Sequence, residues 1–170
     1  MKGLQYFACA LIALTAGAQA RELTSAQIAQ DIRSHGARSV VQTLDHAGRF
    51  DTVLSRIASG KADWIRLAPD LAKGTDAGNS TSLSIALAKA LPRNPRTVVK
   101  ALRHDSVIGA DSVCGLPFIE PTQSEVTTYL DKAIPAVTGV PKSDQFPQRT
   151  ACLVALTHAK ESAASQKMTP

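Results

Sequence analysis

Four short segments with helical periodicity follow one another between Phe50 and His104, and they constrain the fold more than any other part of this 170-residue sequence. In each segment apolar residues recur at spacings of one, three and four, which places them on one face of an α-helix. Gly, Pro or polar residues end each segment. The alternation that marks half-buried strands is nearly absent. The segments are FDTVLSRIASG, ADWIRLAPDLAKG, NSTSLSIALAKALP and NPRTVVKALRH. We therefore predict an all-α fold.

Capping motifs predict further helices on both sides of this region. Thr24-Ser25-Ala26-Gln27 and Thr122-Gln123-Ser124-Glu125 match the capping box, in which a threonine and the third residue after it satisfy free backbone N–H groups. Residues 37–48 and 148–161 also have a helical pattern, and we predict about seven short helices in all. Because their apolar spacing recurs without a fixed period, we expect an irregular and only loosely HEAT-like array.

Prolines and polar caps predict where these helices begin, break and end. Pro69 removes a backbone donor within the second segment, so we expect a kink or a break there. Asn79 or Ser80 is expected to cap the third segment, and Asn94, with proline after it, the fourth. The helix after the second capping box is expected to end before Pro135. Residues 105–121, between the fourth segment and the second capping box, lack helical periodicity and are predicted to be irregular.

The first twenty residues have the features of a cleavable signal peptide. Lys2 gives a positive start, an apolar run covers 4–16, and Ala18-Gln19-Ala20 fits the small-x-small pattern of a cleavage site. The run of about 13 residues is shorter than the roughly 20 that a membrane-spanning helix needs. We expect cleavage after Ala20, a periplasmic location and no transmembrane segment in the mature chain.

Because the chain is expected to be exported, we expect its remaining cysteines to form a structural disulfide. Cys9 leaves with the signal peptide, so Cys114 and Cys152 remain as an even pair in an oxidising compartment. A bridge closing a loop of about 40 residues stabilises a fold by about 4 kcal/mol in the chain-entropy model. Two isolated cysteines without a C-x-x-C motif make a poor zinc site. We therefore predict a Cys114–Cys152 disulfide, no metal and no cofactor.

The length and charge of the remaining chain limit its number of domains and the kind of partner it can bind. Residues 21–161 suffice for one helical domain, and 162–170 read as a disordered polar tail. In the full sequence Lys and Arg number 19 against 14 Asp and Glu, a net charge of +5, and removal of Lys2 with the signal peptide leaves +4. This balance permits attraction to anionic partners but does not argue for nucleic acid. We expect another envelope protein, acidic in character, as the partner.

A run of basic residues recurs at spacings of 4, 3, 4 and 3 without an intervening acid: Lys89, Arg93, Arg96, Lys100 and Arg103. On one continuous helix they would form a cationic stripe. Two prolines interrupt that helix, so only the last three share a face. We predict that Arg96, Lys100 and Arg103 bind the acidic partner, with a solvated helix face as the alternative.

Residue types that could carry catalysis occur without a recognisable motif. The four histidines have no metal-ligand spacing, and no G-x-S-x-G is present. Carboxylates such as Asp70 and Asp76 could still pair through the fold, so an envelope hydrolase with a carboxylate-based site is the alternative to a binding protein. Trp64, the only tryptophan, belongs either to the core or to a binding surface.

Four strings of sequence support a family resemblance: D-W-I (63–65), G-T-D-A-G (74–78), A-L-P-R-N-P (90–95) and V-C-G-L-P (113–117). Together they resemble a family of exported proteobacterial proteins with no established activity. The resemblance implies export and a compact helical domain, and it assigns no catalytic residue. The function that we predict is binding, as an immunity-type inhibitor of an envelope-acting toxin or enzyme, or as an accessory factor.

Overall fold

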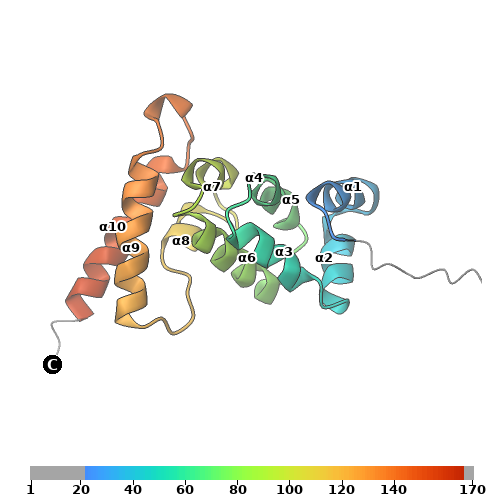
Figure 1. Cartoon of the computed structure of the whole chain (residues 1–170), viewed down its shortest axis with the longest axis horizontal. Coiled ribbons are helices and arrows are strands. Elements are labelled where there is room, and N and C mark those ends of the chain that lie inside the picture. The colour runs from blue at the N-terminus through green and yellow to red at the C-terminus, as the bar shows by residue number, and fades with distance from the viewer. Residues whose placement is uncertain (1–21, 167–170) are drawn as a thin grey trace, which may run out of the picture.

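The computed structural model describes residues 22–166, and within this range the chain is helical and contains no strand (Figure 1). The all-α prediction is therefore confirmed. The elements are α1 (Ser25–His35), α2 (Ala37–His46), α3 (Phe50–Ala58), α4 (Ala62–Ile65), α5 (Ala68–Leu71), α6 (Ala77–Ala90), α7 (Pro95–Ala101), α8 (Ala110–Cys114), α9 (Gln123–Thr138), the 3₁₀ helix η1 (Lys142–Asp144) and α10 (Arg149–Gln166). The predicted signal peptide lies outside the described residues.

The helices form an irregular array rather than a regular solenoid. Figure 1 shows α1 and α2 at one end, the paired α9 and α10 at the other, and α3 to α8 between them. The most extensive helix packing joins α9 to α10, α3 to α6 and α8 to α10. The loop between α9 and α10, which carries η1, projects beyond the ends of both helices. None of the helices in the described range is long and apolar enough to cross a bilayer.

One continuous core runs through the array, from Ile28 in α1 to Leu156 in α10. Its centre consists of fully buried aliphatic side chains such as Leu83 and Leu87 of α6. Ser84 is the only buried polar residue in the described range, and its hydroxyl donates to the carbonyl of Val107 at 2.7 Å. This bond ties the segment after α7 to α6. A continuous core fits the predicted single domain.

The described range contains ten α-helices and one 3₁₀ helix, more than the predicted number of about seven, and two local features explain part of the difference. The break expected at Pro69 is present, and it divides the second segment into α4 and α5. The stretch 105–121, predicted to be irregular, contains the single-turn helix α8. Both capping threonines accept from the backbone as predicted, and the box at Thr122 is complete. Asn94 also caps α7 as predicted.

Three predicted helix boundaries were wrong: the start of α6 and the ends of α9 and α10. α6 begins earlier than predicted, because the Asp76 side chain caps it by accepting from the Asn79 N–H at 2.9 Å. α9 continues through Pro135, since Ala133 and Val137 are fully buried and hold its last turn on the core. α10 runs on to Gln166, where Ala163 packs against the core and its carbonyl accepts from Gln123. Residues 167–170 of the predicted tail are not described.

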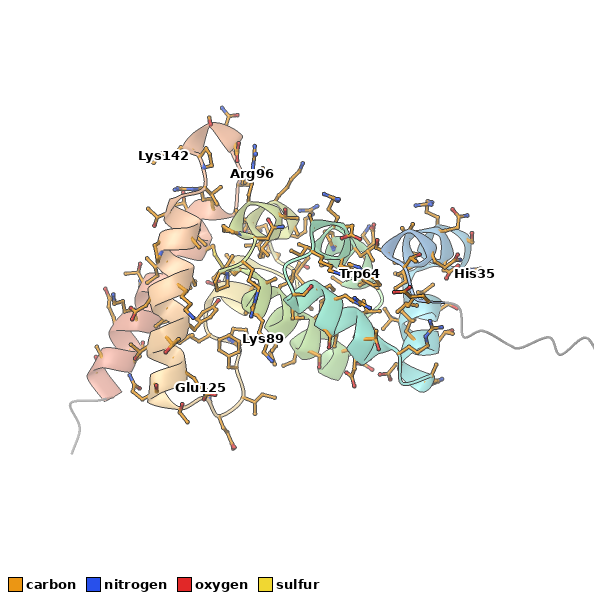
Figure 2. All side chains as sticks on the ribbon, in the orientation of Figure 1. His35, Trp64, Lys89, Arg96, Glu125 and Lys142 are labelled. Carbon is orange, nitrogen blue, oxygen red and sulfur yellow. A yellow bond between two sulfur atoms is a disulfide. The ribbon has the colours of Figure 1, made fainter. Side chains whose placement is uncertain are left out.

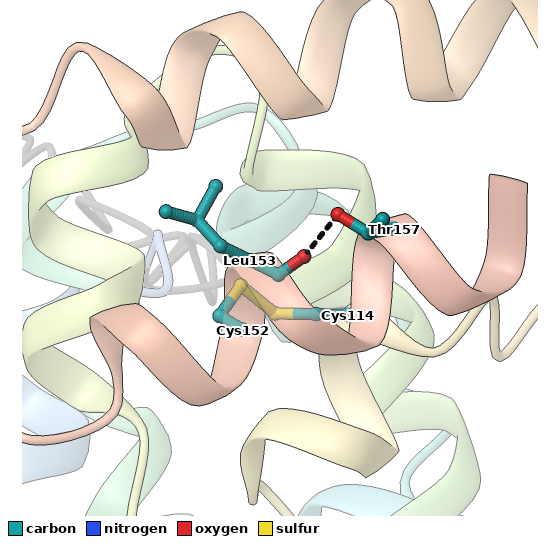
Figure 3. Close-up of a disulfide and its surroundings, with 4 residues drawn as sticks. All are labelled: Cys114, Cys152, Leu153 and Thr157. Atoms are coloured by element: carbon teal, nitrogen blue, oxygen red, sulfur yellow. Dashed lines mark hydrogen bonds between the residues drawn. A yellow bond between two sulfur atoms is a disulfide. The ribbon is translucent and has the colours of Figure 1, made fainter.

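A disulfide joins Cys114 at the end of α8 to Cys152 in α10, as predicted (Figure 3). Both cysteines are fully buried, and the Cα atoms are 5.3 Å apart. The bridge fastens the C-terminal helix pair to the centre of the array. It also fixes the residue from which the irregular segment 115–121 leaves α8.

Candidate functional site

The predicted cationic face borders a hollow of about 430 Å³ beside α7. Asn94 starts α7 by accepting from the Thr97 N–H, and its own side-chain amide donates to the Gly60 carbonyl at 2.9 Å. Val98 and Val99 are buried, which turns the opposite face of the helix outward. We call this the α7 hollow. Its walls are Arg66, Pro69, Arg96, Thr97, Lys100, Ala101, Arg103, Asp144 and Phe146.

Arg96 forms an ion pair with a carboxylate of the same chain, that of Asp144. Its Nη2 donates to Asp144 Oδ1 at 2.8 Å, and its Nε lies 2.8 Å from Asp144 Oδ2. The Asp144 side chain is 11% exposed, whereas Arg96 is 68% exposed. Figure 2 shows Arg96 beside the projecting loop that carries Lys142 and η1. The pair is therefore an ion pair with one charge-assisted hydrogen bond, at Oδ1, and Oδ2 has no hydrogen bond within the described residues.

The other predicted cations have different environments. Arg103 Nη1 donates to the carbonyls of Lys100, Ala101 and Leu102 at 2.9–3.1 Å, so it caps the C-terminal end of α7. Lys100 is exposed at the rim. Arg66, from the turn between α4 and α5, adds a fourth cation that the sequence analysis missed. Nothing local in the sequence links it to α7, because the fold brings it there from 30 residues upstream.

Trp64 does not belong to this surface. Its side chain in α4 is 5% exposed and lies within the continuous core. The prediction that it could anchor a partner is therefore wrong, and its alternative, a core residue, is correct. The bulk of an indole ring favours burial whenever the helix that carries it has a neighbour on that side.

The first half of the basic run contributes to a second hollow, of about 650 Å³. It lies where the end of α6 faces α9, and Figure 2 labels Lys89 and Glu125 on its two sides. We call it the α6–α9 hollow. Its walls are Lys89, Pro92, Arg93, Ser124, Glu125, Thr128, Tyr129 and Lys132. The two prolines thus separate the predicted stripe into two sites that face different parts of the molecule.

Tyr129 in the α6–α9 hollow has an unusual environment. Its ring packs edge to face against Phe118, with centroids 4.9 Å apart. Its hydroxyl is buried and has no hydrogen-bond partner within the described residues. Burial raises the pKa of the Tyr129 phenol. The hydroxyl is therefore a neutral donor at physiological pH, in a place where such groups normally have a partner.

The carboxylates weighed for a hydrolase each bind a structural partner. Asp70 forms an ion pair with Lys73 at 2.7 Å, and Asp76 caps α6. A hydrogen bond from Ser25 lowers the pKa of Asp63, and one from the Thr122 N–H lowers the pKa of Glu125. A carboxylic general acid needs a raised pKa. Within the described range, His, Cys, Asp and Glu also form no group of three or more that could hold a metal ion.

Comparisons with known proteins add no assignment to this geometry. No family model matches the chain, and neither curated proteins nor solved structures give a match. The resemblance to an exported proteobacterial family therefore stays a prediction.

Proposed function

We propose that this chain is an exported helical binding protein that holds an acidic envelope protein through the α7 hollow. The observation that carries the proposal is the contact between Arg96 and Asp144. A carboxylate already sits in the hollow: its Oδ1 accepts from Arg96 Nη2 at 2.8 Å, and its Oδ2 lies 2.8 Å from Arg96 Nε in the same ion pair. Carboxylates of an acidic partner are the same chemical group, and Lys100 and Arg66 offer them further cations.

The walls of the α7 hollow also suit a protein ligand. Pro69 and the partly buried Phe146 add apolar surface beside the cations. Aromatic and arginine side chains are the residue types most often found at the energetic centre of interfaces. Exposed charges at the rim speed association and select against partners of the wrong sign. The partner would be a toxin or enzyme for an immunity-type inhibitor, or a larger complex for an accessory factor.

Export supports the envelope as the place of binding. The leader pattern of the first twenty residues predicts export, and the buried disulfide is a bond that persists in oxidising compartments. A carboxylate-based hydrolase remains the alternative class of protein. It has less support, because the carboxylates of Asp70 and Asp76 each bind a structural partner rather than each other.

The test is affinity recovery of the tagged protein from envelope extract of its own cells. Reversing two rim cations, with Arg66→Glu and Lys100→Glu, should reduce recovery of the specific partner at least about tenfold and flatten its salt dependence. Arg38→Glu with Lys160→Glu changes the net charge equally at exposed residues that line neither hollow. It should leave recovery unchanged.

Equal recovery with both double variants would show that the α7 hollow is not the binding surface. Release of soluble products from envelope material by the purified chain would instead support the hydrolase. Because the tested residues exclude the Arg96–Asp144 pair, the variants leave the loop with η1 in place. Thermal unfolding of each variant checks that the fold is kept.

A further inference from the structure

The α6–α9 hollow continues into an apolar hollow of about 520 Å³, and the two share Lys89, Glu125 and Tyr129 in their walls. Beyond the shared residues, one end carries the cations Arg93 and Lys132. The other end is formed largely by apolar side chains of α6 and of the segment before α9, and it also carries the carboxylate of Glu120, away from the cationic end. The surface therefore changes from cationic to apolar across a distance that one small molecule could cover. Hollows of this size are typical of small-ligand sites.

Ile119 stands at the apolar end and is 76% exposed, the most exposed large hydrophobic side chain in the described range. Single exposed apolar residues are common and need no explanation. This one is next to Phe118, whose ring packs on Tyr129, and both face the same hollow. The apolar end thus has a partly buried wall and an exposed rim.

The backbone that presents these residues is strained. Leu116 and Glu120 both adopt left-handed conformations, with φ of 61° and 46°. Residues with a Cβ atom seldom adopt this region, and they persist there where the surrounding structure holds them. Here the disulfide at Cys114 fixes one end of the segment, and the capping box at Thr122 fixes the other. Strain of this kind concentrates where a chain clamps a ligand.

The cationic end has more positive than negative charge. Lys89, Arg93 and Lys132 face one carboxylate, that of Glu125, within the α6–α9 hollow. Glu125 already accepts two hydrogen bonds from Thr122, from its N–H at 2.9 Å and its hydroxyl at 2.8 Å. The three cations remain exposed, and Tyr129, whose buried hydroxyl has no hydrogen-bond partner within the described residues, lines the same hollow. This arrangement suits the oxygen atoms of an anion.

We propose that the two joined hollows bind a single-chain amphiphile with an anionic head group, such as a long-chain carboxylate. The head group would accept from Tyr129 and lie among Lys89, Arg93 and Lys132, and the apolar chain would run along Phe118 and Ile119. The buried phenol gains the acceptor that it otherwise lacks. The apolar chain covers the exposed rim at Ile119. This site is separate from the α7 hollow and does not depend on the function proposed for it.

The test is isothermal titration of the protein, as cells produce it, with sodium dodecanoate below its micelle concentration. We expect one binding site. Tyr129→Phe removes only the hydroxyl and should weaken binding at least about tenfold, as loss of a hydrogen bond to a charged group would. Lys132→Glu should weaken it further, whereas Lys160→Glu, with the same charge change on α10, should not. Ile119→Ser should weaken it more than Val154→Ser, which alters another exposed apolar residue.

Ligand controls separate the head group from the chain. Dodecyl maltoside, with a neutral head, and inorganic phosphate, without a chain, should each bind far more weakly than dodecanoate. Equal binding of dodecanoate and dodecyl maltoside would overturn the proposal, and so would equal effects of Lys132→Glu and Lys160→Glu. Binding to anionic vesicles without binding to monomeric dodecanoate would assign the surface to a membrane instead. Thermal unfolding confirms that each variant is folded.

Discussion

The α7 hollow and the α6–α9 hollow are each lined by one half of the same basic run. Each also contains a buried polar group, and these two groups differ in their bonding partners. In the α7 hollow the nearly buried Asp144 carboxylate forms an ion pair with Arg96 and accepts one hydrogen bond from it at Oδ1, although its Oδ2 has no hydrogen bond within the described residues. In the α6–α9 hollow the Tyr129 hydroxyl is buried and has no partner among the described residues. A paired buried group contributes to the fold, whereas an unpaired one lowers stability and indicates a ligand. The two sites can be compared by removing these groups.

Arg96→Ala should have the largest effect on stability. It leaves the Asp144 carboxylate in a nearly buried position without its cation. Such an orphaned group costs about 1–3 kcal/mol, so the free energy of unfolding should fall by that amount. Chemical denaturation with urea, followed by circular dichroism, measures the change. If the loop with η1 opens and hydrates the carboxylate, the loss will be at the lower end of this range.

The double variant Arg96→Ala with Asp144→Asn is the control for this prediction. Because the carboxylate and its cation are then removed together, the double variant should be more stable than the single one. The resulting double-mutant cycle isolates the pairwise contribution. An Arg96→Ala variant as stable as the unmodified protein would mean that Asp144 is not held by Arg96 in solution, and the contrast between the hollows would disappear.

Tyr129→Phe should have a smaller effect and the opposite sign. The substitution removes a buried hydroxyl that lacks a partner and keeps the ring on Phe118. The free energy of unfolding of the ligand-free protein should therefore stay equal or rise by up to about 1 kcal/mol. The same urea denaturation measures it. Together with the weakened dodecanoate binding, a gain in stability is the signature of a group kept for a ligand.

Phe118→Leu gives the matched comparison at this position. It removes the edge-to-face contact, which contributes about 0.5–1.5 kcal/mol beyond burial, and should lower stability. A clear loss in Phe118→Leu shows that the assay detects packing changes in this part of the core. Loss of stability in Tyr129→Phe by a similar amount would contradict the comparison, because the hydroxyl would then have a partner in solution.

Sequence periodicity and capping motifs predicted most of the helices, because both are local properties of the chain. The errors lie where neighbouring signals compete. Asp76, Asn79 and Ser80 are all good N-caps, and only the path of the chain from α5 decides that Asp76 is used. At Pro135 the local rule predicts an end, but burial of Val137 outweighs the missing backbone donor.

The composition of both hollows could be predicted only in part. The basic run was visible in the sequence, and its division at the prolines followed from local rules. Arg66, Asp144 and Lys132 come from distant segments, so their presence beside that run depends on tertiary packing. The lack of a partner for Tyr129 depends on every neighbour at once, and no local sequence signal reports it.

The smallest predicted effect concerns Glu125, which forms part of the wall that the α6–α9 hollow shares with its apolar neighbour. The N–H of Thr122 and then its hydroxyl lower the pKa of Glu125 in the folded protein. A group with a lowered folded pKa stabilises the fold above its ordinary pKa. That contribution is lost as the pH falls through the ordinary glutamate range and then through the lower pKa of the folded state.

Glu125→Gln is the matched variant for this pH effect. Glutamine can still accept from Thr122 in the capping box but does not titrate. The difference in unfolding free energy between pH 7 and pH 3 should therefore be smaller in Glu125→Gln than in the unmodified protein, and the two should converge at the acidic end. Solvent screens this exposed site, so the effect should be weaker than those of Arg96 and Tyr129. The α7 hollow should be unaffected, because Asp144 lies apart from the capping box. An identical loss of stability on acidification in both proteins would show that the bonds from Thr122 do not favour the ionised form of Glu125.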